Sequence, residues 1–75
     1  MPKLPNISGN QAVKCFEKIG YQVIRQRGSH IRMCHKSDSA KRPLTIPGHK
    51  TLGKGLMRKL LRDAELTVEE FSRLL

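Results

Sequence analysis

This chain of 75 residues carries 15 Lys and Arg against 6 Asp and Glu, which gives a formal net charge of +9 and a pI near 10.3. A chain of this length forms one domain, here residues 1–75, and buries only about 60% of its unfolded surface. Its sites must therefore lie in shallow grooves, and no deep cofactor pocket is expected. Apolar runs of two or three residues are far shorter than the roughly 20 that span a bilayer.

The positive charge is uneven along the chain. Residues 1–62 hold 14 Lys and Arg but only Glu17 and Asp38 as acids, a net charge of +12, whereas residues 63–75 hold Arg73 against four acids. Such a field favours phosphate-rich or acidic partners, although a basic surface can also serve solubility alone. Two cysteines and no apparent signal peptide indicate a cytoplasmic, reduced protein.

The first helix is predicted between Ser8 and Gly20. Residues 1–7 are expected to be extended, because Pro2 and Pro5 disfavour the helical conformation in the residues before them. Ser8 and Gln11 have the spacing of a capping box, and Gly20 is typical of the left-handed residue that ends a helix. Between them, apolar residues recur at helical spacing: Ala12, Val13, Phe16 and Ile19.

Three short strands are predicted next. Residues 21–27 and 30–36 are rich in β-branched and alternating residues, and Gly28-Ser29 between them indicates a hairpin. A third strand, Arg42 to Ile46, follows a polar turn over residues 37–40 and ends at Pro47-Gly48. The succession predicts an antiparallel meander.

Two helices complete the predicted order. After His49-Lys50 the chain is expected to become helical, with Lys54, Arg58 and Arg62 on the face opposite the apolar one. The apolar face comprises Leu56, Met57, Leu60, Leu61 and Ala64. Thr67 and Glu70 form a second capping box, which starts a short helix. The inward residues of that helix are expected to be Val68, Phe71, Leu74 and Leu75.

These elements predict an α+β fold of order α-β-β-β-α with a short C-terminal helix. The sheet has three antiparallel strands, with the helices on one face and the other face open. Side chains alternate along a strand, so Ile31, Met33 and His35 should share the helix side. His30, Arg32 and Cys34 are then expected on the open face.

The scarcity of acids argues against metal-dependent phosphoester chemistry, which needs clustered carboxylates. A zinc site is not expected either, because the cysteines and histidines lack ligand spacing. Histidine titrates near neutral pH and can transfer protons, and RNA supplies its own nucleophile in the 2′-hydroxyl. His30 is the most favourable candidate, whereas His35 is interpreted as a strand-end residue and His49 as a loop residue.

An ordered series of segments resembles the HicA toxins, the small mRNA interferases of HicA–HicB toxin–antitoxin systems. The resemblance covers about residues 7–75, and its most specific element is Gly28-Ser29-His30. The other segments are Gly20-Tyr21, residues 25–27, 44–49, 55–61 and 66–71. It implies a fold like the double-stranded-RNA-binding domain, RNA cleavage with His30 as the catalytic residue, inhibition of translation and growth, and a HicB-type antitoxin that covers this region.

On this interpretation the protein is a metal-independent endoribonuclease that acts on mRNA. Ser29, with Gly28 beside it, is expected to donate a hydrogen bond to the scissile phosphate, and the RNA backbone contacts are expected from Arg25, Arg27, Arg32 and Lys54. The resemblance does not identify a second catalytic acid or base. Many members of the family carry His or a polar residue directly after the Gly-Ser-His motif, whereas this chain has Ile31 at that position.

Two alternatives remain. One is a non-catalytic module that binds double-stranded RNA by shape and 2′-hydroxyl contacts. The other is an accessory protein that reaches DNA through its antitoxin complex, since direct DNA binding is not expected.

Overall fold

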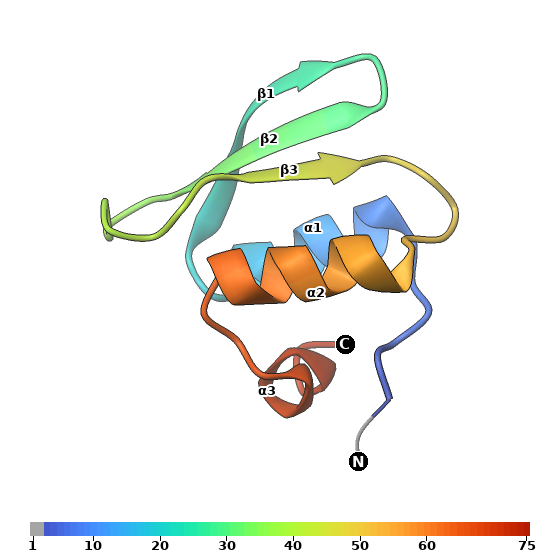
Figure 1. Cartoon of the computed structure of the whole chain (residues 1–75). Coiled ribbons are helices and arrows are strands. Elements are labelled where there is room, and N and C mark those ends of the chain that lie inside the picture. The colour runs from blue at the N-terminus through green and yellow to red at the C-terminus, as the bar shows by residue number, and fades with distance from the viewer. Residues whose placement is uncertain (1–2) are drawn as a thin grey trace.

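The computed structural model describes residues 3–75, over which three helices and three strands follow in the expected order (Figure 1). Residues 3–7 belong to no helix or strand, and Pro2 lies outside the described residues. The elements are α1 (Gly9–Lys18), β1 (Tyr21–Arg27), β2 (His30–His35), β3 (Leu44–Pro47), α2 (Lys54–Asp63) and α3 (Val68–Ser72).

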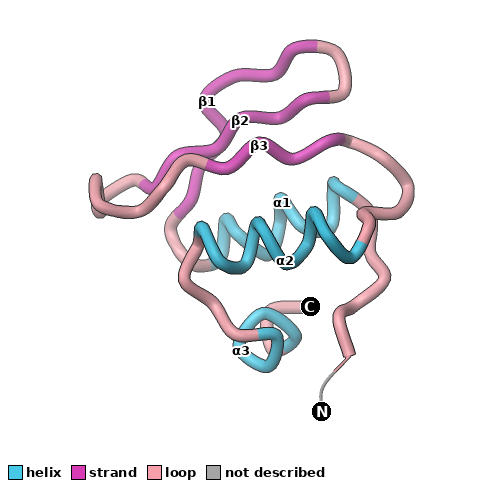
Figure 2. Tube along the Cα trace, in the orientation of Figure 1, coloured by secondary structure: helices cyan, strands magenta, loops and turns pink. Residues whose placement is uncertain are grey.

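The strands form an antiparallel sheet in the order β1-β2-β3, so β2 is central. Helices α1 and α2 cover one face of this sheet, and α3 packs beyond them (Figure 2). The core between the layers contains the chain's three aromatic residues, Phe16, Tyr21 and Phe71, all at most 1% exposed. The predicted α+β architecture is confirmed, and the face of the sheet turned away from the helices is left open.

Local signals set the ends of α1 and α3. The backbone N–H of Gln11 donates to Ser8 Oγ at 3.2 Å, and Ser8 N–H donates to Gln11 Oε1 at 3.0 Å. Thr67 and Glu70 repeat this exchange at α3, at 2.9 and 3.0 Å. Both capping boxes satisfy backbone donors that a helix start leaves without partners, as the sequence predicted.

Gly20 follows α1 with φ of +104°, a conformation that side chains disfavour. A Cβ there would lie 2.6 Å from Nε2 of His35, which packs directly over it. The chain needs glycine at this point, as the sequence predicted, because the backbone turns tightly into β1 beneath that imidazole.

Two predicted boundaries in the second half are wrong. The third strand begins at Leu44 rather than Arg42, because Pro43 has no N–H to give to a ladder and the Arg42 carbonyl accepts from the Tyr21 hydroxyl at 3.1 Å. Helix α2 begins at Lys54 rather than just after Lys50, because Leu52 is buried and its N–H donates to the Ile7 carbonyl at 2.9 Å.

Two end positions also differ from the prediction. Strand β2 ends at His35, one residue short of Lys36, whose N–H instead donates to the Gly20 carbonyl at 2.9 Å. Leu75 was expected to face the core but is 55% exposed, because α3 ends at Ser72 and only Leu74 turns back onto the core.

Strand β1 contains a β-bulge that decides which side chains reach the open face. Val23 pairs with Met33, but the next pair is Arg25 with Arg32, so Ile24 has no partner of its own. Directly opposed residues of an antiparallel pair lie on the same face. The extra residue therefore moves Arg25 and Arg27 to the face opposite the helices, where they pair with Arg32 and His30, whereas Gln26 pairs with Ile31 on the helix side.

Candidate functional site

A shallow hollow of about 110 Å³ lies on the open face of the sheet. All three strands line it, with Arg25, Arg27, His30, Arg32 and Thr45. The structure thus brings together four of the residues that the sequence singled out. No carboxylate is among the described residues that line the hollow, so its charge is positive and uncompensated.

His30 is the first residue of β2 and is exposed. It is opposed by Arg27 on one side and by Pro47 on the other, so both neighbouring strands fix its backbone. The Gly28-Ser29 turn precedes it, with Gly28 at φ +55°, and the Gln26 amide donates to the Gly28 carbonyl at 3.1 Å. Because pairing with both strands fixes its backbone, His30 holds its imidazole where a ligand on the open face can reach it.

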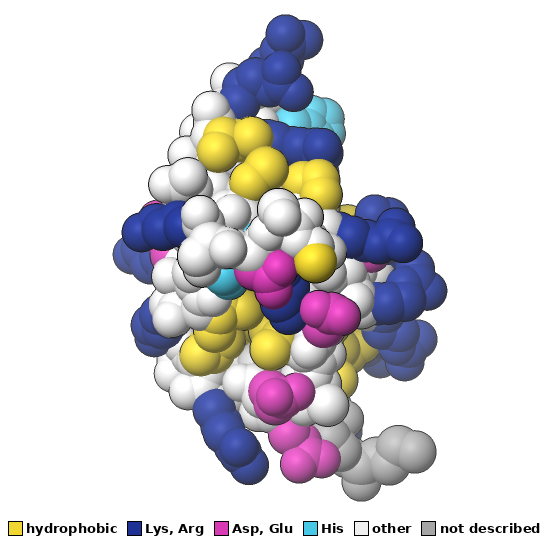
Figure 3. All heavy atoms as spheres, turned by 90° about the vertical axis from the view of Figure 1, so that its left-hand side faces the viewer, with side chains coloured by type: hydrophobic (Ala, Val, Ile, Leu, Met, Phe, Trp, Pro, Cys, Tyr) yellow, Lys and Arg dark blue, Asp and Glu magenta, His cyan; other side chains and the backbone are white. Residues whose placement is uncertain are grey.

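The arginines around His30 occupy neighbouring positions on strands β1 and β2. Arg25 is directly opposite Arg32, and Arg32 Nη1 donates to Thr45 Oγ1 at 2.9 Å. The ion pairs that the structure shows, Lys41–Glu65 and Lys59–Asp63, involve other parts of the surface. Figure 3 shows Lys and Arg at the sheet end and along both flanks of the molecule, whereas Asp and Glu gather toward its middle and the α3 end. Guanidinium groups in this setting favour a bound phosphate.

Lys54 and the turn residues lie outside this hollow. Lys54 is the first residue of α2 and lines a different, larger hollow of about 570 Å³ with Lys3, Arg58 and residues 67–69. Gly28 and Ser29 lie at the exposed hairpin tip, and the Ser29 carbonyl accepts from the Gly48 N–H. Within residues 3–75, no histidine lines the larger hollow, whereas His30 lines the smaller one.

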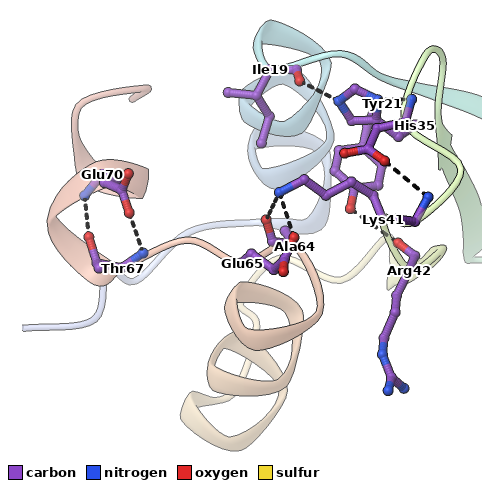
Figure 4. A network of polar contacts seen from close by, with 11 residues as sticks. Ile19, Tyr21, His35, Lys41, Arg42, Ala64, Glu65, Thr67 and Glu70 are labelled. Atoms are coloured by element: carbon purple, nitrogen blue, oxygen red, sulfur yellow. Dashed lines mark hydrogen bonds and ion pairs between the residues drawn. The ribbon is translucent and has the colours of Figure 1, made fainter.

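His35 has a structural role, which Figure 4 shows. Its Nε2 is 2.9 Å from the Ile19 carbonyl, and its Nδ1 accepts from the N–H groups of Ser37 and Asp38 at 3.3 and 3.1 Å. This network assigns the proton to Nε2. The ring packs edge-on against Tyr21. Both ring nitrogens are thus occupied in joining the end of α1 to the β2–β3 loop, as expected of a strand-end residue.

Cys15 offers little nucleophilic character. Burial raises the pKa of Cys15, against the smaller opposing effect of Lys18, and its thiol donates to the Leu74 carbonyl at 3.6 Å. Cys34 is half-buried on β2. Over residues 3–75, no three His, Cys, Asp or Glu side chains come together as metal ligands would.

The bulge is the feature that sequence reasoning missed. Strict alternation from the buried Tyr21 would place Arg25 and Arg27 on the helix face. Two arginines on the apolar face of a strand conflict with the tendency of charged side chains to stay in solvent, and this conflict signals a break in alternation. In the structure, the unpaired Ile24 shifts the register and places both arginines on the open face.

Comparison with known families identifies the family of this chain. The family described as "HicA toxin of bacterial toxin-antitoxin" matches residues 9–66, from the first residue of α1 to just before α3. A comparison with curated proteins found no match. Among the described helices, none has the length and apolar character needed to cross a membrane.

Proposed function

Because this chain belongs to the HicA toxin family of bacterial toxin–antitoxin systems, we propose that it is an endoribonuclease that cleaves mRNA in the cytoplasm and so inhibits translation and growth. The observation that carries the proposal is the hollow in which His30 lies among three arginines on an open sheet face. A HicB-type antitoxin would neutralise the toxin by covering this face.

The proposed reaction uses the RNA as its own nucleophile. His30 accepts the proton of a 2′-hydroxyl as its oxygen attacks the adjacent phosphorus. The P–O2′ bond forms, the P–O5′ bond breaks, and the leaving 5′-oxygen takes up a proton, so the products are a 2′,3′-cyclic phosphate and a 5′-hydroxyl. Arg25, Arg27 and Arg32 stabilise the charge that builds on the phosphorane oxygens, and Ser29 at the hairpin tip donates to the phosphate. The proposed mechanism routes no step through a metal ion.

Purified protein and a single mRNA transcript provide the test. His30→Ala should lower the cleavage rate by about 10²–10⁴-fold, the usual contribution of one proton-transfer group. Binding of the transcript should persist, because the arginines remain, and the melting temperature should not change, because His30 is exposed. Cleavage by His30→Ala at the wild-type rate would contradict the assignment.

Two further measurements distinguish the proposed enzyme from a non-catalytic RNA-binding module and from a metal-dependent nuclease. Wild-type protein that binds double-stranded RNA without cleaving any RNA would instead indicate the non-catalytic module. Activity should persist in a chelator, and a loss that a divalent ion restores would contradict the metal-independent mechanism. In cells, growth arrest should require His30 and should be relieved by co-expressed HicB-type antitoxin.

A further inference from the structure

Cleavage of RNA by its 2′-hydroxyl needs two proton transfers, one from the nucleophile and one to the leaving 5′-oxygen. His30 can serve one of them, and the other residues that line the hollow are three arginines and Thr45; a guanidinium group does not exchange protons as a general acid or base does. Among the remaining titratable groups, His35 is occupied at both ring nitrogens. The Tyr21 hydroxyl is buried and donates to the Arg42 carbonyl. This leaves His49.

The backbone brings His49 to the same end of the sheet as His30. His30 is opposed by Pro47, and His49 is two residues further along the chain. Opposed Cα atoms lie about 5 Å apart, and two extended residues add at most about 7 Å, so the two histidine Cα atoms lie within about 12 Å. Two imidazoles at that spacing can reach the same phosphodiester from its two sides.

Backbone hydrogen bonds hold the loop that carries His49 in place. The Gly48 N–H donates to the Ser29 carbonyl, and the Gly9 N–H donates to the His49 carbonyl at 2.9 Å. The hairpin tip, the end of β3 and the start of α1 are thereby joined at one end of the molecule (Figure 1). The His49 side chain itself is exposed. A fixed backbone with a free imidazole suits a group that must meet a substrate.

Resting on the proposed function, we propose that His49 is the general acid that protonates the leaving 5′-oxygen. The arginines of the hollow stabilise the negative charge that develops on the 2′-oxygen as His30 takes its proton, so the base belongs inside the hollow. His49 is outside the hollow lining. A 5′-oxygen that lies near His49, outside the hollow, is further from the arginines and depends on a donated proton. The P–O5′ bond then breaks as the proton passes from His49 to that oxygen.

A sulfur substitution tests the role directly. An RNA oligonucleotide spanning a mapped cleavage site is made with either oxygen or sulfur as the bridging 5′ atom, because a thiolate leaves without being protonated. His49→Ala should cleave the oxygen substrate about 10²–10⁴-fold more slowly than wild type. On the sulfur substrate it should recover to within a few-fold of the wild-type rate. His30→Ala should stay slow on both substrates.

Several outcomes would overturn the role of His49. Equal losses on both substrates would make His49 a positioning residue, and wild-type cleavage of the oxygen substrate would give it no role. Thr51→Ala, an exposed change in the same loop, is the matched control and should cleave both substrates normally. The loop should survive His49→Ala, because the bonds that hold it come from backbone atoms, and an unchanged melting temperature checks this. If wild-type protein cleaves neither substrate, the proposed function fails instead.

Discussion

Gly9→Ala is a small substitution whose effect depends on the close packing of α1 against the end of β3. Gly9 is buried at the first position of α1. An added Cβ would overlap the Pro47 carbonyl oxygen and lie 2.9 Å from its carbonyl carbon and 3.0 Å from Gly48 Cα. All three atoms belong to the backbone, so no side chain can rotate away. Either α1 or the end of β3 must move.

Two opposing terms set the expected magnitude. Replacing Gly by Ala in a helix usually stabilises a protein by about 0.5–1 kcal/mol. Overpacking a closely packed site costs about 1–3 kcal/mol, and contact with fixed backbone belongs at the upper end of that range. We expect a net loss of about 1–2 kcal/mol, which lowers the melting temperature of a domain of this size by roughly 4–16 °C.

Thermal and urea denaturation provide the measurement, and Gly55→Ala provides the control. Gly55 is exposed in α2, where an added Cβ meets nothing within 4 Å, so the same substitution should raise the melting temperature by a few degrees. The two variants should thus change stability in opposite directions. If Gly9→Ala is as stable as wild type or more so, the close approach of α1 to β3 does not constrain the fold.

Three further predictions concern charge and capping. Ser8→Ala should lower the free energy of unfolding by about 1 kcal/mol in denaturant titrations, because the α1 cap is lost. Arg32→Ala should reduce the salt-dependence slope of RNA binding by about one phosphate and also slow cleavage, whereas Lys54→Ala, outside the His30 hollow, should weaken binding with single-turnover cleavage unchanged. Hydrogen bonds from Thr67 hold the pKa of Glu70 below its ordinary value of 4.5, so this carboxylate stabilises the fold above pH 4.5 and the contribution is lost as pH falls through the lowered pKa. Acid titration of Glu70→Gln should therefore show a shallower loss of stability than wild type.

Features specified by a few neighbouring residues were predictable from the sequence. The capping boxes at Ser8 and Thr67 and the glycine turn at Gly20 depend only on residues within a few positions along the chain. The basic face of α2 followed in the same way from helical periodicity. Such local patterns predicted the order of the elements and the position of His30 on the open face.

Boundaries that depend on long-range contacts were less predictable. The start of α2 depends on Leu52, which bonds to Ile7 far back in the chain, and the start of β3 depends on the Tyr21 hydroxyl that reaches Arg42. The position of His49 likewise follows from its bond to Gly9 rather than from its neighbours. The residues were visible in the sequence, but the contacts that decide their roles are not local.

The bulge at Ile24 gives the site both its charge and an energetic cost. By shifting the register it places Arg25 directly opposite Arg32, and like charges at such a position destabilise a sheet. A domain this small has little stability to spare, so an unfavourable pair on an open face is evidence that the charge serves binding. An anionic occupant would relieve the repulsion. Under the proposed function this occupant is an RNA phosphate or an acidic face of the antitoxin, and the two would compete for the same arginines, which would be the electrostatic basis on which covering this face silences the toxin.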